Sequence, residues 1–415
     1  MFKKRITPFA CAVVSMLVCI ATVIATLSIS SIGDKKEVND NRLESAELGK
    51  YKDLITLIGN DKEKYEKLST MIAMIEGYYV HGYEESKLWE DMYRSLARAL
   101  GDDYSQYLTA EEYNSLIDSA DGDFVGIGVH ATYDIDTHGI YIFGVIPNSP
   151  AEKAGLKKGD IVIKAEGIEA TEKNYYDMLD SVRGKAGTNV NVTVLRGEEK
   201  LDFIITRQAV ESENVLYQKL DGNIAYIRIL SFADTRVSEE FVSKIALAQS
   251  EKCEKFIFDV RNNGGGYLDE ILAVLDILLP EGPIINIVDK NGKTQTHNSD
   301  KNCINGEMVV LCNGNTASAA ELFTAALRDY ELAKIVGQKT FGKGTMQTTR
   351  LLSDGSALKL SVAYYNPPSN VSYDKIGIKP DYEVTLTEYW ENRYFKMPMD
   401  EDTQLQKAIE LLNSK

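Results

Sequence analysis

The chain of 415 residues carries 46 basic and 62 acidic side chains, a formal net charge of −16, and 44% apolar residues. At roughly 100–200 residues per domain, this length predicts two to four domains, and the ordinary composition excludes a disordered or collagen-like chain. The acidic balance disfavours nucleic acid as a partner, because a phosphate backbone needs a basic face. The chain holds 4 histidines, which argues against a histidine-rich metal site and limits the choice of a catalytic base.

The amino terminus combines a basic start with a long apolar run. Lys3, Lys4 and Arg5 precede a stretch from Phe9 to Ile32 that holds no charged residue. This stretch is about long enough to cross a bilayer as one helix, and the basic start places the amino terminus in the cytoplasm. We expect an uncleaved membrane anchor, with a cleaved signal peptide as the alternative. In either case the remaining chain, with a net charge of −19, lies outside the cytoplasmic membrane.

Residues 34–50 are polar and charged, which predicts a linker, and a helical region follows in residues 51–123. Apolar residues recur there at three- and four-residue spacing, first before Val80 and again in the segment that stops at Gly101. We expect the aromatic and methionine side chains on these faces to pack rather than to act chemically.

The periodicity changes near Phe124, where short apolar runs separated by turn residues predict strands. Helix-like stretches that begin at Ser149 and Tyr175 interrupt these runs. We therefore expect residues 124–208 to form a small sheet-based module.

From residue 209 onward, predicted strands and helices alternate. Runs that end at Leu230, Val260 and Asn313 predict strands, and a stretch with helical periodicity follows each of them. This alternation predicts a largely parallel or mixed sheet covered by helices. The carboxyl-terminal residues 386–415 end in a short predicted helix.

Ser318 lies between a predicted strand and an apolar helix, in the segment from Thr316 to Glu321. A serine followed three residues later by glutamate fits a helix-capping box, which is a purely structural role. The same position also exposes a nucleophile at a strand-to-helix turn, where backbone N–H groups point toward developing negative charge. The sequence contains no G-x-S-x-G elbow, and the residues alone leave both interpretations open.

Lys343 lies in a segment from Gly337 to Gly344 that nearly matches a phosphate-binding loop. Such a loop requires Ser or Thr at the position of Gly344 and a helix after it, whereas the following residues predict a strand. Phe341 gives the lysine an apolar neighbour. A base that works near neutrality needs its pKa lowered by roughly 3 units, and burial can supply that shift. A solvated lysine in a glycine turn is the structural alternative.

Two further glycine segments suit the binding of negative charge. Gly264, Gly265 and Gly266 follow a buried strand, and their N–H groups form either an anion-binding nest or simply a tight strand-to-helix turn. Residues 126–129 open the sheet module, where backbone N–H groups can hold the terminal carboxylate of a peptide that adds as a strand. A strand with a bulge is the alternative for this second segment.

Histidine and metal chemistry find little support in the sequence. His81, His130, His138 and His297 lie outside the strand-end motifs of the α/β region, and His297 falls in a predicted polar loop. A Ser-His-Asp triad depends on proximity in space, so the sequence does not exclude one. No CxxC or His-x-x-x-His pattern occurs, and we therefore expect neither a metal nor a cofactor.

Taken together, these motifs resemble those of the carboxyl-terminal processing peptidases, serine proteases that carry a PDZ domain before the protease core. The matching pieces, in chain order, are residues 103–113, 126–128, 148–160, 183–188, 259–266, 316–321, 340–345, 354–360 and 377–381. One departure is Gly264, where the family usually has proline, and we expect a looser glycine loop as a result.

The resemblance implies catalysis by a serine and a lysine. Ser318 matches the family's nucleophile, Lys343 its base, and Gln347 the residue that orients the lysine in some members. The N–H groups of Ala319 and Gly265 match the donors of the oxyanion hole.

The resemblance also implies how a substrate is recognised. It identifies the small module as a PDZ domain that binds peptide carboxylates at Gly126, Ile127, Gly128 and Val129. Arg183 resembles the arginine that couples the position of the PDZ domain to the active site in some members. Formation of a homodimer through the helical segments is a further expectation at the level of the family.

The sequence therefore predicts a multidomain α/β (α+β) protein that acts as an extracytoplasmic serine endopeptidase on proteins with apolar C-terminal tails. The predicted parts are an anchor or signal (1–33), a linker (34–50), a helical region (51–123), a PDZ domain (124–208), a serine protease core (209–385) and a helical tail (386–415). A non-catalytic PDZ scaffold is the alternative, and an exported nucleotide-binding protein is a third hypothesis.

Overall fold

The computed structural model describes residues 62–120, 123–211 and 213–414. The predicted anchor and linker lie outside these residues. Within the described part of the chain, no helix combines the length and apolar character that a membrane crossing requires.

The chain divides into two compact units, residues 1–84 and residues 85–415. In the first unit the structure describes helix α3 (Lys62–Tyr78), which exposes Met71, Met74 and Tyr78.

The second unit begins with helices α4 (Glu85–Arg98) and α5 (Ala110–Ala120), which flank the short strand β1 (Gln106–Leu108). Arg94 of α4 donates hydrogen bonds to Glu90 on the same helix and to Glu112 on α5. The helical prediction for this region is wrong at β1, which pairs antiparallel with a strand of the protease core, because its structure depends on a partner far along the chain.

The predicted PDZ module is a small antiparallel sheet with two helices, as the sequence predicts. The strands are β2 (Asp123–Gly126), β3 (Val129–Tyr133), β4 (Ile140–Val145), β5 (Ile161–Ala165), β6 (Ile168–Glu169), β7 (Asn189–Arg196), β8 (Glu199–Thr206) and β9 (Gln208–Glu211), and the helices are α6 (Pro150–Ala154) and α7 (Tyr175–Val182). The main sheet has the order β3-β4-β5-β7-β8, while β2 pairs with β9 and so joins the two ends of the module. Val190, Val192 and Val194 alternate along β7 and point into the core, which explains its period of two.

The predicted protease core is built on a mixed and largely parallel sheet. Its strands are β10 (Val215–Leu220), β11 (Ile224–Ile229), β12 (Lys255–Asp259), β15 (Glu307–Cys312), β16 (Ala333–Gly337) and β19 (Tyr382–Glu383), in the order β10-β11-β12-β15-β16-β19. The β10–β11 pair is antiparallel and the other pairs are parallel. This arrangement confirms the prediction of a mixed sheet.

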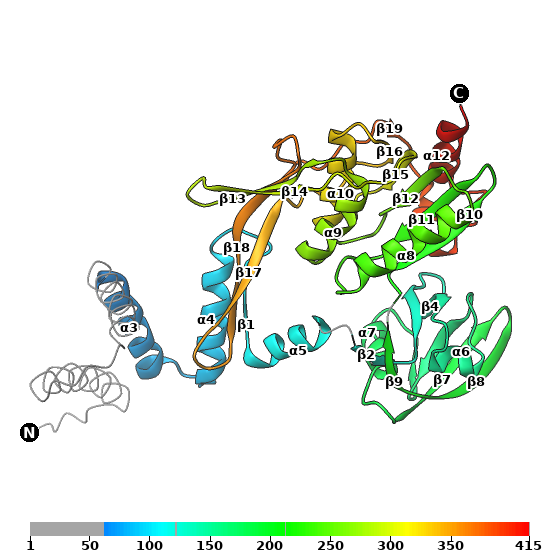
Figure 1. The fold of residues 1–415 in the computed structure, drawn as a ribbon. Coiled ribbons are helices and arrows are strands. Elements are labelled where there is room, and N and C mark those ends of the chain that lie inside the picture. Colours follow the sequence, from blue (N-terminus) through cyan, green and yellow to red (C-terminus); the bar gives the residue numbers. More distant parts are fainter. Residues whose placement is uncertain (1–61, 121–122, 212, 415) are drawn as a thin grey trace, which may run out of the picture. The chain divides into compact units, whose positions relative to one another are not determined.

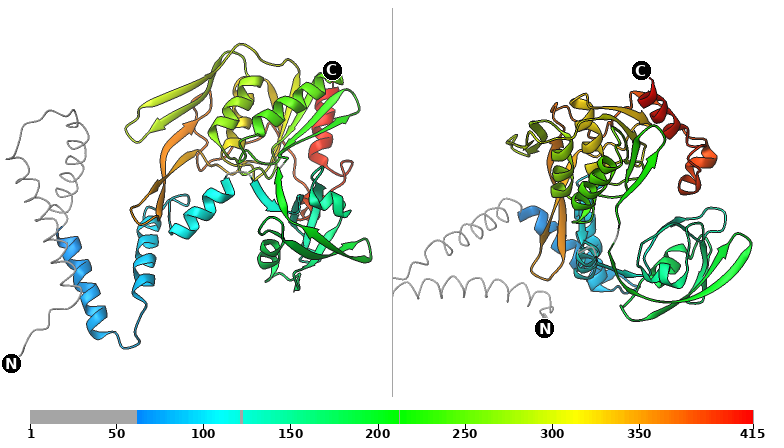
Figure 2. Two further views of the ribbon diagram at one scale, coloured as in Figure 1. Left: turned by 60° about the horizontal axis from the view of Figure 1, so that its bottom comes forward. Right: turned by 45° about the vertical axis from the view of Figure 1, so that its right-hand side comes forward.

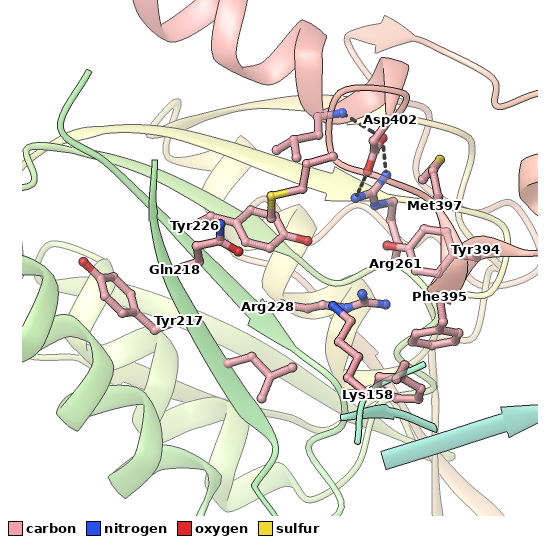
Figure 3. Close-up of a pocket in the computed structure, with 14 residues that line it drawn as sticks. Lys158, Tyr217, Gln218, Tyr226, Arg228, Arg261, Tyr394, Phe395, Met397 and Asp402 are labelled. Carbon is pink, nitrogen blue, oxygen red and sulfur yellow. Dashed lines mark hydrogen bonds and ion pairs between the residues drawn. The ribbon is translucent and has the colours of Figure 1, made fainter. Parts of the chain in front are cut away.

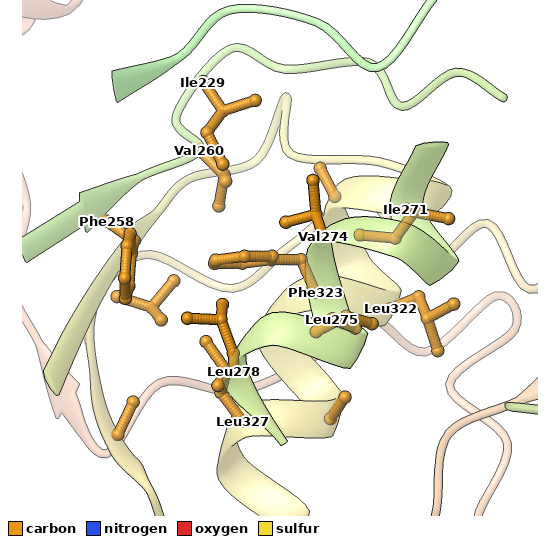
Figure 4. Close-up of a cluster of buried hydrophobic side chains, with 14 of the residues drawn as sticks. Ile229, Phe258, Val260, Ile271, Val274, Leu275, Leu278, Leu322, Phe323 and Leu327 are labelled. Carbon is orange, nitrogen blue, oxygen red and sulfur yellow. The ribbon is translucent and has the colours of Figure 1, made fainter. Parts of the chain in front are cut away.

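Helices cover both faces of this sheet (Figures 1 and 2). Helices α8 (Val237–Ser250), α9 (Leu268–Leu278) and α10 (Ala319–Asp329) pack on one face, and α12 (Thr403–Asn413) packs on the other. In Figure 4, Phe323 of α10 lies among side chains from the sheet and from α9, and its ring meets that of Phe258 edge-on at 5.6 Å. The buried face of α10 fixes the helix on the sheet and thereby positions its first residue.

A second sheet extends from the core. It consists of β13 (Gly282–Asp289), β14 (Thr294–Ser299), β17 (Thr345–Leu351) and β18 (Ala357–Asn366), together with β1. The prediction that His297 lies in a polar loop is wrong, because His297 is part of β14 and pairs with Ile285. The β14 segment has no apolar alternation, so its sequence carries no strand signal. The chain continues through α11 (Glu388–Glu391) and a 3₁₀ turn (Tyr394–Lys396) to α12.

Candidate active site

Three sequence motifs meet at one edge of the protease sheet. The strands β12, β15 and β16 are parallel neighbours, so the loops that follow them leave the sheet at the same edge. Hydrogen bonds join these loops, from the Ala317 N–H to the Asn263 carbonyl at 2.9 Å and from the Phe341 N–H to the Thr316 carbonyl at 3.0 Å. The topology of the sheet thus brings together segments that are about 25 to 80 residues apart in the chain.

Ser318 sits at the start of α10 in a strained backbone conformation. Its φ of 58° and ψ of −122° fall in a region that residues other than glycine rarely adopt, at a typical cost of about 1–3 kcal/mol. The Glu321 carboxylate accepts the Ser318 N–H at 3.0 Å, which is the carboxylate half of a capping box. Ser318 therefore caps its helix through the backbone while its hydroxyl points elsewhere, and the two interpretations of the sequence are compatible.

Glu321 ties the serine turn to the lysine loop. Its buried carboxylate also accepts hydrogen bonds from the Thr340 hydroxyl at 2.6 Å and from the N–H groups of Gly342 at 2.6 Å and Lys343 at 2.7 Å. Burial raises the pKa of Glu321, and these hydrogen bonds oppose that rise. The N–H groups that a phosphate would need therefore hold a carboxylate of the protein itself, and strand β17 follows the loop instead of a helix.

Tyr365 of β18 is a site residue that the sequence did not reveal. Its hydroxyl lies 3.0 Å from Ser318 Oγ and 2.7 Å from the Lys343 carbonyl oxygen. A carbonyl only accepts and a phenol has one proton, so both bonds form together when Tyr365 donates to the carbonyl and accepts from Ser318. Burial raises the pKa of Tyr365, which keeps its hydroxyl neutral.

The Lys343 side chain is half-buried and its ammonium nitrogen lies over the ring of Tyr104, 4.5 Å from the centroid. Burial lowers the pKa of Lys343, and the nearby positive charge of Lys359 lowers it further. The negative charges of Asp102 and Glu321 oppose this shift. A lowered pKa favours the neutral amine that a general base requires.

Among the described residues, no hydrogen bond joins Lys343 Nζ to Ser318 Oγ. The amide of Gln347 donates to the Thr345 carbonyl at 3.1 Å and to Ser361 Oγ at 3.0 Å, and not to Lys343. The structure therefore brings the loops of the serine and the lysine together, while the ammonium group of Lys343 lies over the Tyr104 ring and makes no hydrogen bond to Ser318 Oγ.

Gly265 adjoins the serine so closely that only glycine fits there. Its φ is 96°, and a Cβ added to it would lie 2.7 Å from Ser318 Cβ and 2.9 Å from the Ala319 nitrogen. The Gly265 N–H donates to Asn263 Oδ1 at 2.8 Å, so it must leave this partner to serve as an oxyanion donor. Ala319 is the first residue of α10, directly after the serine. A Cβ added to Gly264 would meet no atom within 4 Å, and a larger residue there has room.

The predicted carboxylate-binding loop of the PDZ module lies between β2 and β3. The Ile127 carbonyl accepts a hydrogen bond from the Ala151 N–H at 2.7 Å. Gly128 has a φ of 83°, and a Cβ on it would lie 2.3 Å from Ser149 Cβ. These constraints fix the loop between Gly126, the last residue of β2, and Val129, the first residue of β3. Arg183 follows α7 and forms an ion pair with Asp180 at 3.8 Å.

A buried ionic network centred on Arg261 lies at the start of the glycine loop. Arg261 donates two hydrogen bonds to Asp259, at 2.9 and 2.7 Å, and two to Asp402, at 2.9 and 2.8 Å. Burial acts to raise the pKa of Asp259, but the Arg261 guanidinium prevails and lowers it to about 2. Asp402 precedes α12 and also caps it through the Leu405 N–H at 3.0 Å, so the network joins the glycine loop to the carboxyl-terminal helix.

Comparisons with known proteins agree with this architecture. The family model described as "Peptidase family S41" matches residues 223–384, and the model described as "PDZ domain" matches residues 124–206. A "Probable CtpA-like serine protease" from Staphylococcus haemolyticus is 32% identical over 337 residues, which are 80% of this chain and 67% of that protein. The chain belongs to peptidase family S41.

Other relatives support membership in family S41. A protein of the same name from Staphylococcus aureus (strain N315) is 33% identical over 333 residues, which are 79% of this chain and 66% of the relative. The chain thus spans 66% of the length of this relative. Among solved structures, a photosystem II D1 C-terminal processing protease has a TM-score of 0.50 and 27% identity, and the match covers 83% of this chain and 91% of that one. A protein from Bacteroides fragilis described as an S41 protease shares the fold, with a TM-score of 0.58 and 18% identity over 77% of this chain and 89% of that one.

Proposed function

We propose that the protein is a serine endopeptidase that cleaves proteins after its PDZ domain captures their apolar C-terminal tails. The observation that carries this proposal is the meeting of the three strand-end loops, which places a strained serine at a helix start beside the loop of a half-buried lysine. Membership in family S41 and the serine proteases among its relatives support the same reaction.

In the proposed reaction, the neutral amine of Lys343 takes the proton of the Ser318 hydroxyl as Oγ attacks the scissile carbonyl. The N–H groups of Ala319 and Gly265 stabilise the oxyanion. Protonated Lys343 then gives its proton to the leaving amine, and water hydrolyses the acyl-enzyme with the lysine again as base. Gln347 orients the lysine once Nζ has turned away from the Tyr104 ring.

We further propose that the loop from Gly126 to Val129 binds the terminal carboxylate of the substrate and that Arg183 couples this binding to the active site. The fixed geometry of the loop around Gly128 supports a preformed carboxylate site. Residues 1–33 anchor the enzyme with its amino terminus in the cytoplasm, so the protease acts outside the cytoplasmic membrane. The exposed apolar side chains of α3 suit a homodimer contact.

The test uses the variants Ser318→Ala and Lys343→Ala with a protein substrate that ends in an apolar tail. We expect each variant to lose cleavage almost completely, because the single changes remove the nucleophile or its base. Arg350→Ala is a matched control, since Arg350 is an exposed residue of β17. Full activity of either variant would disprove the assignment.

A non-catalytic scaffold is the second candidate, because no hydrogen bond joins Ser318 and Lys343 within the described part of the chain. A scaffold would bind tails without activating its serine. A fluorophosphonate probe distinguishes the two functions. We expect the probe to label the wild type and not Ser318→Ala, whereas a wild type that binds tails but resists the probe supports the scaffold.

A further inference from the structure

Arg228 of β11 is a partly buried cation, and the Nε–Nη2 edge of its guanidinium is buried without a hydrogen-bond partner among the described residues. Its Nε and Nη2 are buried and make no hydrogen bond to any described residue. The rings of Tyr394 and Phe395 lie 4.8 and 4.7 Å from the centre of its guanidinium group. Such contacts engage the faces of the guanidinium and supply no acceptor to the N–H groups of Nε and Nη2, which lie in its plane.

The same edge binds carboxylates elsewhere in this protein. Arg196 and Arg236 each donate from Nε and Nη2 to the two oxygens of one aspartate, at distances between 2.7 and 3.1 Å. Arg261 does so with Asp259. This paired geometry is the usual one between arginine and a carboxylate, and Arg228 is set apart from these three by the lack of such a partner among the described residues.

Two carboxylates near Arg228 are already engaged, that of Asp259 and that of Asp402, which lines the cavity described below together with Arg228. Asp259 accepts hydrogen bonds from Arg261, from the Tyr226 hydroxyl at 2.5 Å and from the Tyr394 hydroxyl at 3.1 Å. Asp402 is held by Arg261. A buried charge without a partner is destabilising, and a bound anion relieves that penalty.

Arg228 lines a cavity of about 280 Å³ that receives side chains from three parts of the chain. The PDZ module contributes Lys158, the strands β10 and β11 contribute Arg228 and Leu216, and the carboxyl-terminal segment contributes Met397 and Leu405. In Figure 3, the side chains of Arg228 and Lys158 both extend toward the space beside Phe395. The cavity thus combines the cations Arg228, Lys158 and Arg261, the last of which is paired with Asp402, with apolar side chains. Its volume is just below that of typical ligand pockets, which span roughly 300–1,000 Å³.

We propose that this cavity binds a small apolar carboxylate, with the carboxylate held by Arg228 and Lys158 and the apolar group against Met397 and Leu405. The Nε–Nη2 edge is covered in the present conformation, so the guanidinium turns toward the cavity that it lines when the ligand enters. The ligand is the C-terminal residue of a peptide or a free branched acid. Both present a carboxylate next to an apolar group. The site is separate from the carboxylate loop at Gly128, and the proposal does not depend on catalysis.

The test measures binding by isothermal titration calorimetry to the full-length chain carrying Ser318→Ala, which prevents cleavage. The ligands are 4-methylpentanoate, its neutral amide, inorganic phosphate, and N-acetyl-Ala-Leu with a free or amidated end. We expect the acid to bind at least about tenfold more tightly than the amide, a difference of about 1.4 kcal/mol. Adding Arg228→Met should weaken binding of the acid by a similar factor, and adding Lys158→Met should weaken it less. Arg350→Met is the matched control and should leave binding unchanged.

The peptide arm identifies the source of the carboxylate. A component of peptide binding that is lost in Arg228→Met assigns the site to peptide C-termini, whereas binding of the free acid alone assigns it to small acids. The proposal is overturned if acid and amide bind equally, if phosphate binds as tightly as the acid, or if Arg228→Met binds like its parent. Circular dichroism checks that Arg228→Met is folded. The comparison of the acid with its amide tests whether the protein prefers the carboxylate, and it does not depend on that variant.

Discussion

Lys343 must be neutral to act as a base, and two features of its surroundings favour that state. Burial lowers its pKa, and the positive charge of Lys359 on β18 adds to this effect. Lys359 makes no contribution to the proposed chemistry, so it offers a way to change the base without touching the reacting atoms.

We predict that Lys359→Met raises the pKa of Lys343, because it removes a positive charge that disfavours the protonated lysine. Activity requires the neutral amine, so the acidic limb of the pH profile of kcat/KM should move to higher pH. The measurement is kcat/KM for a tail-bearing peptide across that limb, with Arg350→Met on the neighbouring strand as control. A limb that stays in place or moves to lower pH contradicts the proposed role of Lys343.

Of the three glycines before α9, Gly264 and Gly265 lead to opposite predictions when each is replaced by alanine. Gly265→Ala should lower the free energy of unfolding and abolish activity, because the new Cβ would lie 2.7 Å from Ser318 Cβ at a φ of 96°. Gly264→Ala meets open space and should stabilise the fold by about 0.4–1 kcal/mol through reduced entropy of the unfolded chain. Urea unfolding and peptide cleavage measure both effects. An active Gly265→Ala variant would show that this loop does not adjoin the reacting serine.

At the scale of elements, the sequence predicted the strands and helices that carry the motifs, because buried parallel strands and amphipathic helices have strong periodic signals. It therefore predicted the strand before Ser318, the helix after it and the strand after the Lys343 loop, but not the order of the strands in the sheet. It did not predict Tyr365, whose hydrogen bond to Ser318 spans 47 residues and depends on how the second sheet lies on the first. Strands β1 and β14 were missed because pairing, rather than apolar alternation, defines them.

The network of Asp259, Arg261 and Asp402 joins three elements, and it predicts a specific acid sensitivity. The pKa of Asp259 is about 2 in the folded protein against an ordinary value of 3.8. As the pH falls below about 4, the unfolded chain takes up this proton first, so the folded state loses stability until about pH 2. We expect this single group to contribute about 2 kcal/mol to that loss.

Urea unfolding at a series of pH values between about 4.5 and 2 measures this loss. In Asp259→Asn the amide does not titrate, so the free energy of unfolding should fall less steeply across the same range. The variant should also be less stable by about 3–5 kcal/mol at pH 7, because Arg261 loses a buried partner. Equal pH slopes in the two proteins would show that the network does not control acid stability.

At the scale of the second unit, the PDZ module contacts the carboxyl-terminal segment of the chain. Arg393 pairs with Asp136, and Lys396 pairs with Asp134 and Asp136. The rings of Phe143 and Phe395 stack at 4.1 Å. In this docked arrangement, the described residues show no hydrogen bond between Ser318 and Lys343, which is the state expected of a resting enzyme.

If docking of the PDZ module holds the enzyme at rest, the double variant Arg393→Gln/Lys396→Gln should cleave faster. The substrate is a short peptide without an apolar C-terminal tail, so that capture by the PDZ loop plays no part. We expect its kcat/KM to rise severalfold over that of the wild type. Since the two ion pairs with Asp136 are partly exposed, salt should weaken them. The wild-type rate should therefore increase with ionic strength, while the double variant should respond much less.

Arg350→Gln serves as the control for the loss of an exposed charge. A double variant that is slower than the wild type, or equally sensitive to salt, shows that docking supports catalysis instead of restraining it.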